Sequence, residues 1–322
     1  MNLLSMCEVF ITDGFMYSIL AMGYYISYSV LDFPDLTVEG SVLTGGAVFA
    51  ILARAGVNPW LAMLCSFVAG AAIGCVTGLL HVKLKIRPLL CGILVSTALI
   101  SVNLVITVLG NGGDLNGEGA LTTLGLGPKV NTVLRSFPAN LIPQDAAGIN
   151  LRKVLVMLVV ALIFKLLLDL YLKTKSGMML RAAGNNSVYV SSMAENPDKY
   201  KVIGLAIGNA YSAVSGALIA QSRQNVNQNM GIGMIVIGLA SLIIGMSLFY
   251  RVRFMKPTTK VIIGAIIYQA CLSFATVIGI PSAYNKLLMA VLFTLALVFS
   301  GKLKGKGGKA NAKASQYLYL FQ

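Results

Sequence analysis

The sequence predicts an all-α polytopic membrane protein of about 8–10 transmembrane helices, arranged as two inverted-repeat halves. Of its 322 residues 57% are hydrophobic and only 11% are charged, which is more apolar surface than one soluble core can hide. The apolar residues fall in stretches of about 20, the length that crosses a hydrocarbon layer roughly 30 Å thick. Helices are expected because open strand edges in lipid would leave backbone groups unpaired.

Eight or nine stretches meet this length requirement, within a transmembrane domain expected at residues 1–301. They are residues 9–30, 36–54, 59–80, 88–110, 152–173, 199–221, 231–250, 258–280 and 284–301. We expect the first stretch to stay in the membrane, because residues 1–30 lack the basic start and small-residue cleavage site of a signal peptide.

Lysine and arginine gather in four places, which we expect on the cytoplasmic side because basic connections are retained there. These places are residues 83–87, 173–201, 251–256 and the tail 302–322, which is expected to be basic and disordered beside the membrane. We therefore attribute the net charge of +14 to orientation and lipid contact, and we expect no nucleic-acid binding. The N-terminus is expected outside if the first two stretches both cross.

The longest non-membrane connection, residues 111–150, falls outside under this orientation. Its glycines and Pro128, Pro138 and Pro143 predict an irregular cap with a short helix. The cap is either a docking surface for an external binding protein or a plain connector. The polar residues 222–229 are also expected outside, either as a solvated turn or as a contact for solute or a delivery protein.

A weak internal repeat links two Gly-punctuated segments. Asp35–Arg54 and Asn229–Phe249 each have a polar start followed by an apolar run. The first is expected to run outward and the second inward, as inverted repeats require. Such interrupted segments at corresponding places in two halves point to a pathway near the membrane midplane.

Three carboxylates lie at the junction of the first two apolar stretches, in LDFPDLTVEG. Asp32, Asp35 and Glu39 must face water, a protein partner or a helix N-terminus, because an unpaired charge inside the membrane is costly. The junction is either a broken helix lining a pathway, with Asp35 or Thr37 capping its second half, or an ordinary interfacial turn.

Polar side chains also interrupt three other spans. Asn103, Asn209 and Gln221 either join closely packed helices by hydrogen bonds or line the pathway. The candidate pathway residues are therefore Asp35, Thr37, Glu39, Asn103, Asn209 and Gln221. Lys165 and Asp169, four residues apart on one helix face, are expected to neutralise one another.

No cluster of residues points to catalysis or to a metal. The five cysteines form no CxxC pair and are expected to be reduced packing residues, and His81, the only histidine, reads as an interfacial residue. Nothing matches the nucleotide-binding pattern GxxxxGK[ST], so the chain is not expected to hydrolyse nucleotide. We expect neither an enzyme nor a cofactor.

Residues 174–198 form a polar segment between two long apolar stretches. It carries Lys175 and Arg181, and Asn185, Asn186 and Ser187 make a capping signal ahead of a short amphipathic run. This pattern predicts a short helix outside the membrane, on the cytoplasmic side, where a soluble partner can push on it.

This segment resembles the coupling helix of permease subunits in bacterial ABC importers, in the superfamily of ribose-type and branched-chain amino-acid-type permeases. The pattern T-x-x-G-x-x-x-R-A-x-G-x-N is matched by Thr174, Gly177, Arg181, Ala182, Gly184 and Asn186. DLTVEGS at 35–41 and the Gly-rich run at 229–245 are similar to the two Gly-punctuated elements of the family. Together with GVNPWLA and HVKLKIRPLLCGIL, they most closely resemble an uncharacterised branch with a lipoprotein or periplasmic binding subunit. Some of its members serve aromatic amino acids such as tryptophan.

The resemblance implies a permease subunit of an ATP-driven importer in the bacterial plasma membrane. It would move a small solute, such as an amino acid, that an external binding protein delivers. Cytoplasmic ATPases would dock near Ala182–Ala194, and a second permease copy, identical or paralogous, would complete a dimer. The second-half element lacks the Gly-Gly pair of sugar-type members, which argues against a sugar. The alternative is a secondary transporter driven by an ion gradient, which inverted repeats and membrane carboxylates also suit.

The same resemblance assigns the ATPase-coupling residues. They are Gly177, Arg181, Ala182, Gly184, Asn185 and Asn186. Arg181 would act by charge pairing, Gly184 by permitting a turn or a close approach, and Asn186 by capping a helix.

Overall fold

The computed structural model describes residues 3–113, 123–127, 130–136, 150–250, 252, 254–279, 284 and 286–298. Its long helices are α1 (Leu3–Tyr24, continued by the π-helical η1, Tyr25–Val30), α2 (Val38–Arg54), α3 (Pro59–Leu84), α4 (Pro88–Gly110), α5 (Leu151–Tyr171), α8 (Pro197–Arg223), α9 (Met234–Leu248) and α10 (Pro257–Val277). The short elements are β1 (Thr123–Gly125), α6 (Lys175–Asn185), α7 (Ser187–Ser192), β2 (Asn225–Asn227) and η3 (Gln228–Gly231). A further apolar helix spans Lys286–Val298.

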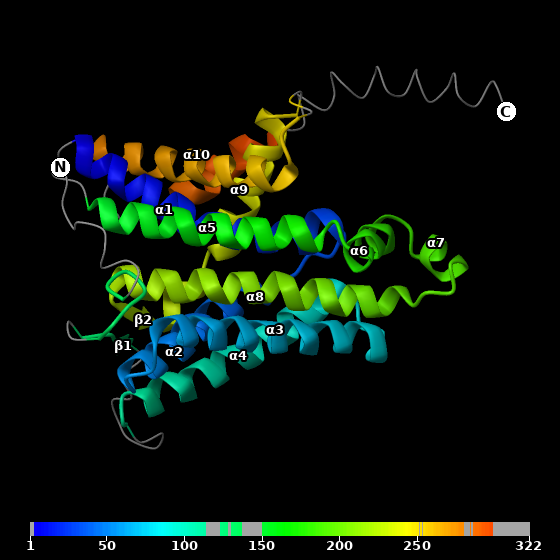
Figure 1. Ribbon diagram of the computed structural model, residues 1–322, viewed down its shortest axis with the longest axis horizontal. Helices are drawn as coiled ribbons and strands as arrows, with labels where there is room; N and C mark the ends of the chain where they lie inside the picture. Colours follow the sequence, from blue (N-terminus) through cyan, green and yellow to red (C-terminus); the bar gives the residue numbers. More distant parts are fainter. Residues whose placement is uncertain are drawn as a thin grey trace.

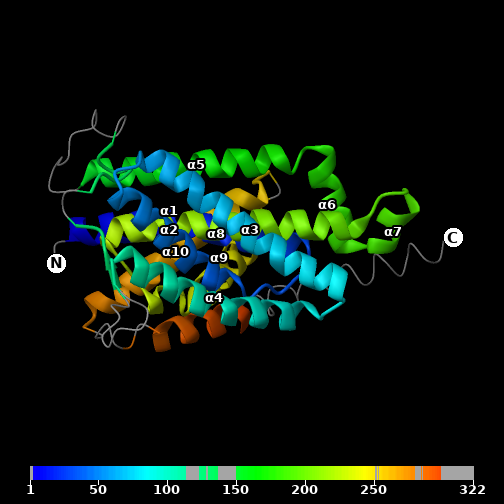
Figure 2. The same cartoon turned by 90° about the horizontal axis from the view of Figure 1, so that it is seen from below.

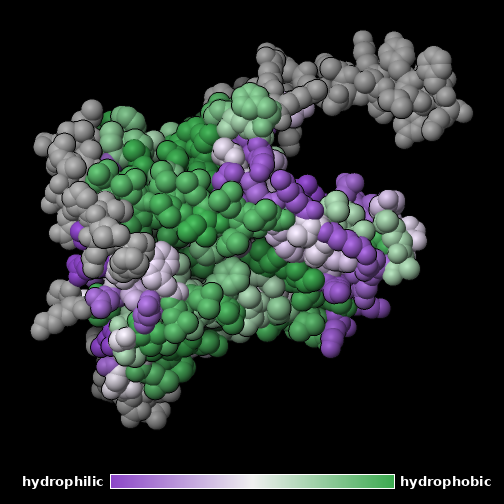
Figure 3. Space-filling view, in the orientation of Figure 1, coloured by the Kyte–Doolittle hydropathy of each residue, from purple (hydrophilic) through white to green (hydrophobic). Residues whose placement is uncertain are grey.

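Seven helical stretches of the described residues are long and apolar enough to cross a membrane, which confirms the predicted polytopic fold. The helix bounds agree with the predicted spans to within a few residues, except that the first helix already begins at Leu3. The long helices lie along one axis, with α6 and α7 at one end of the molecule and β1 and β2 at the other (Figure 1). Apolar surface covers the middle, and hydrophilic side chains gather at the α6–α7 end and also at the opposite end (Figure 3).

Proline and asparagine define where several helices begin. α3, α4, α8 and α10 all start with proline, whose missing N–H costs nothing in the first turn of a helix. The side chains of Asn58 and Asn196 accept hydrogen bonds from the backbone of the first turns of α3 and α8. The sequence therefore fixes these helix starts locally, before any packing is considered.

The helices α2 and α9 run in opposite directions, as predicted for the two repeat segments. α2 ends on the β1 side of the bundle, because Arg54 at its last position donates to the carbonyl of Gly110, the last residue of α4 before β1. α9 ends on the α6 side, because Lys256, which follows α9, donates to Asp169 near the end of α5, just before α6. The packing is also mirrored, because α8 packs against α2 and α3 as α1 packs against α9 and α10.

The helix α8 runs through the middle of the bundle (Figure 2), and small residues let its neighbours approach it closely. Gly23 of α1 and Gly208 of α8 face each other where these two helices cross. A Cβ added to Gly216 would lie 1.9 Å from the carbonyl oxygen of Val42 in α2. The core therefore depends on direct backbone contact between α2 and α8.

We expect Gly216→Ala to destabilise the fold by about 1–3 kcal/mol, because the added methyl group must push α2 away from α8. The free energy of unfolding in detergent measures this. Gly125→Ala is the control, since a Cβ there meets no atom within 4 Å. Equal stability of the two variants would show that the α2–α8 contact is not tight.

One loop prediction needs correction, and another is tested only in part. The predicted solvated turn at 222–229 is wrong: α8 continues to Arg223, and Asn225–Asn227 forms a strand antiparallel to Thr123–Gly125. The 111–150 connection therefore contains a strand, Thr123–Gly125, that was not predicted from the sequence. The short helix expected there has no counterpart among its described residues, and most of that connection and the tail 302–322 lie outside the described part of the chain.

Candidate functional site

The segment between α5 and α8 forms two short helices at one end of the bundle (Figure 1). Thr174 begins α6, and its side chain accepts a hydrogen bond from the backbone N–H of Gly177. Asn186 ends α6 and caps α7 by accepting hydrogen bonds from the N–H groups of Val188 and Tyr189, at 3.1 and 3.2 Å. The predicted capping role of Asn186 is therefore confirmed.

Glycine holds α6 against the rest of the molecule. A Cβ on Gly184 would lie 2.0 Å from the carbonyl oxygen of Val30 and 2.8 Å from the Cα of Leu31, so α6 touches the end of η1 directly. Gly177 makes the same kind of contact with the end of α5. Ala182 packs against the hydrophobic core. These small residues therefore place α6 in direct backbone contact with η1 and with the end of α5.

Arg181 and Asn185 border a cavity between α6 and η1. Arg181 is exposed, and its partner is the Tyr25 hydroxyl of η1. None of the carboxylates in the described ranges forms an ion pair with it, so the charge pairing predicted from the resemblance is not seen within this chain. Asn185 is also exposed and borders two cavities.

The outer surface of α7 carries apolar side chains that the sequence reasoning did not single out. Val188 is 74% exposed and Tyr189 is 56% exposed, although Val190 beside them is buried. Exposed apolar side chains on a projecting helix are typical of a protein contact surface. The amphipathic pattern of SVYVSS contained this information.

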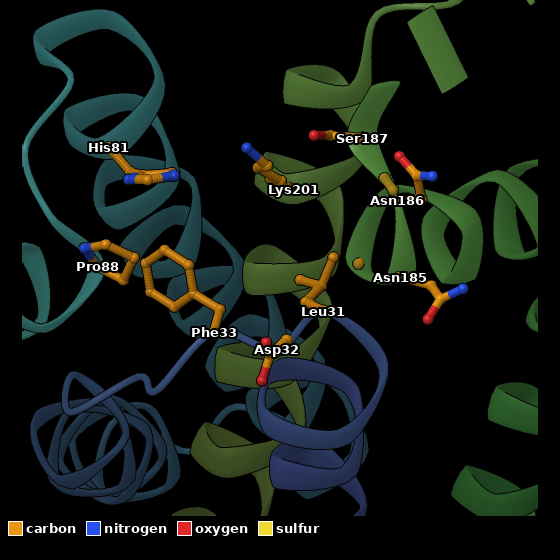
Figure 4. A pocket seen from close by; sticks show the side chains of 11 residues that line it. Leu31, Asp32, Phe33, His81, Pro88, Asn185, Asn186, Ser187 and Lys201 are labelled. Atoms are coloured by element: carbon orange, nitrogen blue, oxygen red, sulfur yellow. The ribbon is translucent and has the colours of Figure 1, made fainter. Parts of the chain in front are cut away.

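A polar cavity of about 380 Å³ separates α6 and α7 from the ends of α3 and α4 (Figure 4). The side chains of Lys201 and Ser187 enter it from one side, and His81 faces them from the other. The imidazole of His81 packs edge-on against Phe33, 5.2 Å between ring centres, and its Nδ1 lies 2.8 Å from the Ile86 carbonyl oxygen. His81 therefore has a local structural role at the end of α3.

A buried hydrogen-bond network holds the broken segment before α2. The Nδ2 group of Asn209 in α8 donates to the Asp35 carboxylate, at 2.6 Å. Thr37 donates to Asp35 through both its N–H and its hydroxyl, and Ser41 donates to the Asn209 carbonyl oxygen, at 2.6 Å. All four side chains are buried. Asp35 thus stabilises the start of α2, as the sequence predicted, whereas the Thr37 side chain makes no capping hydrogen bond.

Two further candidate residues also join elements by hydrogen bonds. Asn103 in α4 accepts from the Thr44 hydroxyl and donates to the Gly40 carbonyl, at 2.7 and 3.2 Å. These two hydrogen bonds connect α4 to α2. Gln221 accepts from the N–H of Val133 near the β1–β2 end. Both side chains are fully buried. Of the two roles predicted for them, they therefore fill the first, hydrogen bonding between closely packed elements.

Glu39 differs from the other five candidates because its carboxylate is only half-buried. Its Oε1 accepts a hydrogen bond of 2.8 Å from the N–H of Gly233, at the start of α9. Glu39 therefore connects the two interrupted segments that the sequence paired as a repeat.

Comparison with known proteins agrees with this geometry. Residues 6–297 match the family described as the permease component of branched-chain amino acid transport systems. The chain belongs to this permease family. It is 37% identical over 302 residues to a tyrosine transport system permease protein of Clostridioides difficile, covering 94% of this chain and 93% of that one. It is 29% identical over 283 residues to an uncharacterised protein of Rickettsia prowazekii, covering 86% of this chain and 91% of that one.

The Escherichia coli ribose import permease is 22% identical over 268 residues, covering 83% of this permease and 77% of that one. No solved structure matches the permease. The family match and the tyrosine permease relative show that this chain is the membrane component of an ABC importer, a transport subunit rather than an enzyme. Membership of this family implies ATPase and binding-protein partners.

A cluster of charged and polar side chains connects α5 to the start of α10, beside α6. Asp169 in α5 accepts from Lys165, Lys256 and Thr258, at 3.0, 3.0 and 2.6 Å. The pair of Lys165 with Asp169 was predicted, but the two partners from the α10 end were not, because they are far away in sequence. This cluster attaches the start of α10 to the helix that leads into α6.

Asp169→Asn is expected to destabilise the permease by about 1–3 kcal/mol, since two ammonium groups lose their carboxylate. The unfolding free energy in detergent measures the loss. The half-exposed pair of Asp198 with Lys201, 3.4 Å apart, supplies the control, and Asp198→Asn should cost about 1 kcal/mol or less. A loss for Asp169→Asn no greater than for Asp198→Asn would contradict the assigned role.

Proposed function

We propose that this permease imports an aromatic amino acid of the tyrosine type, together with an ATPase and an external binding subunit. The observation that carries the proposal is the identity of 37%, over almost the whole of both chains, with a permease named for tyrosine transport. The Gly-rich run at 229–245 lacks the Gly-Gly pair that sugar-type members carry, which agrees with an amino-acid solute. The permease then falls in the aromatic amino-acid branch of its family, with a lipoprotein or periplasmic receptor.

In this proposal α6 and α7 are the cytoplasmic coupling segment. The supporting geometry is the direct contact of Gly184 with Val30 and Leu31, because η1 and the segment after it lead into the broken start of α2. The exposed Val188 and Tyr189 provide apolar surface for the ATPase. Movement of α6, driven by ATP, would thus reach the middle of the membrane through η1.

The working unit in this proposal is a dimer of two identical permease chains with two ATPases. Solute would pass between α2 and α9 and their counterparts in the second copy, since interrupted helices in transporters commonly border the solute site. The buried Asp35, Thr37, Asn103 and Asn209 would then support the shape of the route without touching solute.

Uptake by proteoliposomes tests this function. The permease, the ATPase and the binding subunit encoded beside it are reconstituted together, and accumulation of labelled tyrosine, tryptophan and ribose is measured. We expect ATP-dependent accumulation of an aromatic amino acid and none of ribose. Accumulation of ribose alone would overturn the substrate, and uptake by the permease alone that an ionophore abolishes would overturn the ABC mechanism.

A further inference from the structure

Glu39 lies near mid-depth in the bundle. The adjacent Gly40 backs against Leu99, which is the central residue of α4. Ser41, two residues after Glu39, donates to Asn209, which lies near the middle of α8. A carboxylate at this depth is costly unless it faces protein groups or water, so it marks a functional position in a membrane protein.

Two helix starts meet at this carboxylate. Glu39 belongs to the first turn of α2, and its Oε1 accepts the N–H of Gly233 at the start of α9. The backbone also approaches closely, because a Cβ on Gly231 would lie 2.3 Å from the carbonyl oxygen of Glu39. The positive ends of both helices therefore stabilise a negative charge here.

The second carboxylate oxygen of Glu39 receives no hydrogen bond from any residue in the described ranges. Glu39 is half-buried, and Ile232 beside its partner Gly233 is 52% exposed, so this surface is open in the single chain. Asp35, by contrast, is fully buried and accepts from Thr37 and Asn209. Of the two carboxylates, only Glu39 has an oxygen left for a ligand.

A second observation comes from Tyr24 at the end of α1. Tyr24 is 1% exposed, and its buried hydroxyl has no hydrogen-bond partner among the described residues. Its ring packs on Gly238 of α9, and the hydroxyl lies within electrostatic range of Asp35 and Glu39. A buried hydroxyl without a partner is costly in a folded protein, which suggests that it is used at another stage of the transport cycle.

The charge at this place selects among solutes. The free N-terminus of an interrupted helix attracts the anionic group of a solute. In this permease Glu39 already accepts an N–H at the N-terminus of α9, and its second carboxylate oxygen has no partner among the described residues. The site therefore favours a cationic group, such as the ammonium group of an amino acid, and disfavours a carboxylate or a neutral hydroxyl.

We propose that Glu39 determines specificity in the translocation route by accepting the ammonium group of the passing amino acid, with the Tyr24 hydroxyl as the neighbouring polar group. This inference rests on the proposed import of an amino acid. It distinguishes Glu39 from Asp35, Thr37, Asn103 and Asn209, which are buried and hydrogen-bonded inside the bundle.

Glu39→Gln tests the charge while keeping an oxygen for the Gly233 N–H. With receptor and ATPase held constant, we expect the maximal rate of tyrosine import to fall about tenfold or more, because a charge-assisted hydrogen bond is lost. The KM, which the receptor sets, should stay unchanged, and the free energy of unfolding should fall by no more than about 1–2 kcal/mol, because two helix ends lose a neighbouring negative charge. Glu39→Asp, which keeps the charge, should retain more activity than Glu39→Gln.

The matched control is Glu8→Gln, in which the same change removes the charge of a carboxylate that accepts a backbone N–H, from Asn150 at the β1–β2 end. Its import rate should equal that of the unmodified permease. Import by Glu39→Gln at the same rate as Glu8→Gln would overturn the proposal.

Labelling of Glu39→Cys separates this inference from the choice of solute. A charged, membrane-impermeant thiol reagent is applied to the complete transporter during ATP hydrolysis, and mass spectrometry identifies the modified cysteine. Modification at residue 39 supports an aqueous route there even if tyrosine is not the solute. Absence of modification at residue 39, while an exposed control cysteine at Thr123 is modified, would overturn the inference whatever the transporter imports.

Discussion

Gly184→Val is expected to reduce uptake by about a hundredfold while the permease stays folded in the membrane. A Cβ at this position would lie 2.0 Å from the carbonyl oxygen of Val30, so α6 cannot keep its contact with η1. A displacement of the order of 1 Å in a coupled element is enough to cost about a hundredfold in rate. The measurement is ATP-dependent uptake, together with the amount of permease recovered from the membrane.

Met178→Val is the control for Gly184→Val. It places the same side chain on the same helix at an exposed position, where no packing is lost. Uptake by Met178→Val should stay close to that of the unmodified permease. If Gly184→Val transported as well as Met178→Val, contact between α6 and η1 would not be needed for coupling.

Asn209→Leu is expected to destabilise the permease by about 3–5 kcal/mol, the largest stability effect among these variants. Asn209 donates to the buried Asp35 carboxylate and accepts from the Ser41 hydroxyl. Its Oδ1 also lies 3.0 Å from the hydroxyl of Thr37, which donates to Asp35. Leucine removes these contacts and takes one hydrogen-bond donor away from the buried Asp35 carboxylate. The free energy of unfolding in detergent gives the loss directly.

Two further variants check the cause of this loss. Ser212→Ala, one turn along α8, removes only a hydrogen bond to the carbonyl of Gly208 in the same helix, and should cost about 1 kcal/mol. Adding Asp35→Asn to Asn209→Leu should recover part of the stability, because the buried charge is removed. No recovery would indicate that loss of packing, rather than an unpaired carboxylate, explains the effect.

The sequence predicted most of the helices because their signals are local. Apolar length, the prolines at the starts of α3, α4, α8 and α10, and the capping by Asn186 each act within a few residues. The opposite directions of α2 and α9 followed from the positions of the basic connections, which assign each loop to one side of the membrane.

The contacts between distant parts of the chain could not be predicted in the same way. β1 and β2 are three residues long, too short for a periodic pattern, and about a hundred residues apart. Lys256 and Thr258 reach Asp169 only because α10 packs beside α5. The sequence marked Asp35, Asn209 and Glu39 as polar in an apolar context, but only the fold separates the satisfied Asp35 from the partly open Glu39.

The central claim is that α6 and α7 connect the membrane helices to an ATPase in the cytoplasm. The most direct test places a cysteine at Val188, which is exposed on α7, and another at Thr123 on β1. In intact cells we expect Val188→Cys to cross-link to the ATPase and to be protected from an impermeant external reagent, whereas Thr123→Cys is labelled from outside. Labelling of Val188→Cys from outside, with no cross-link to the ATPase, would contradict the account.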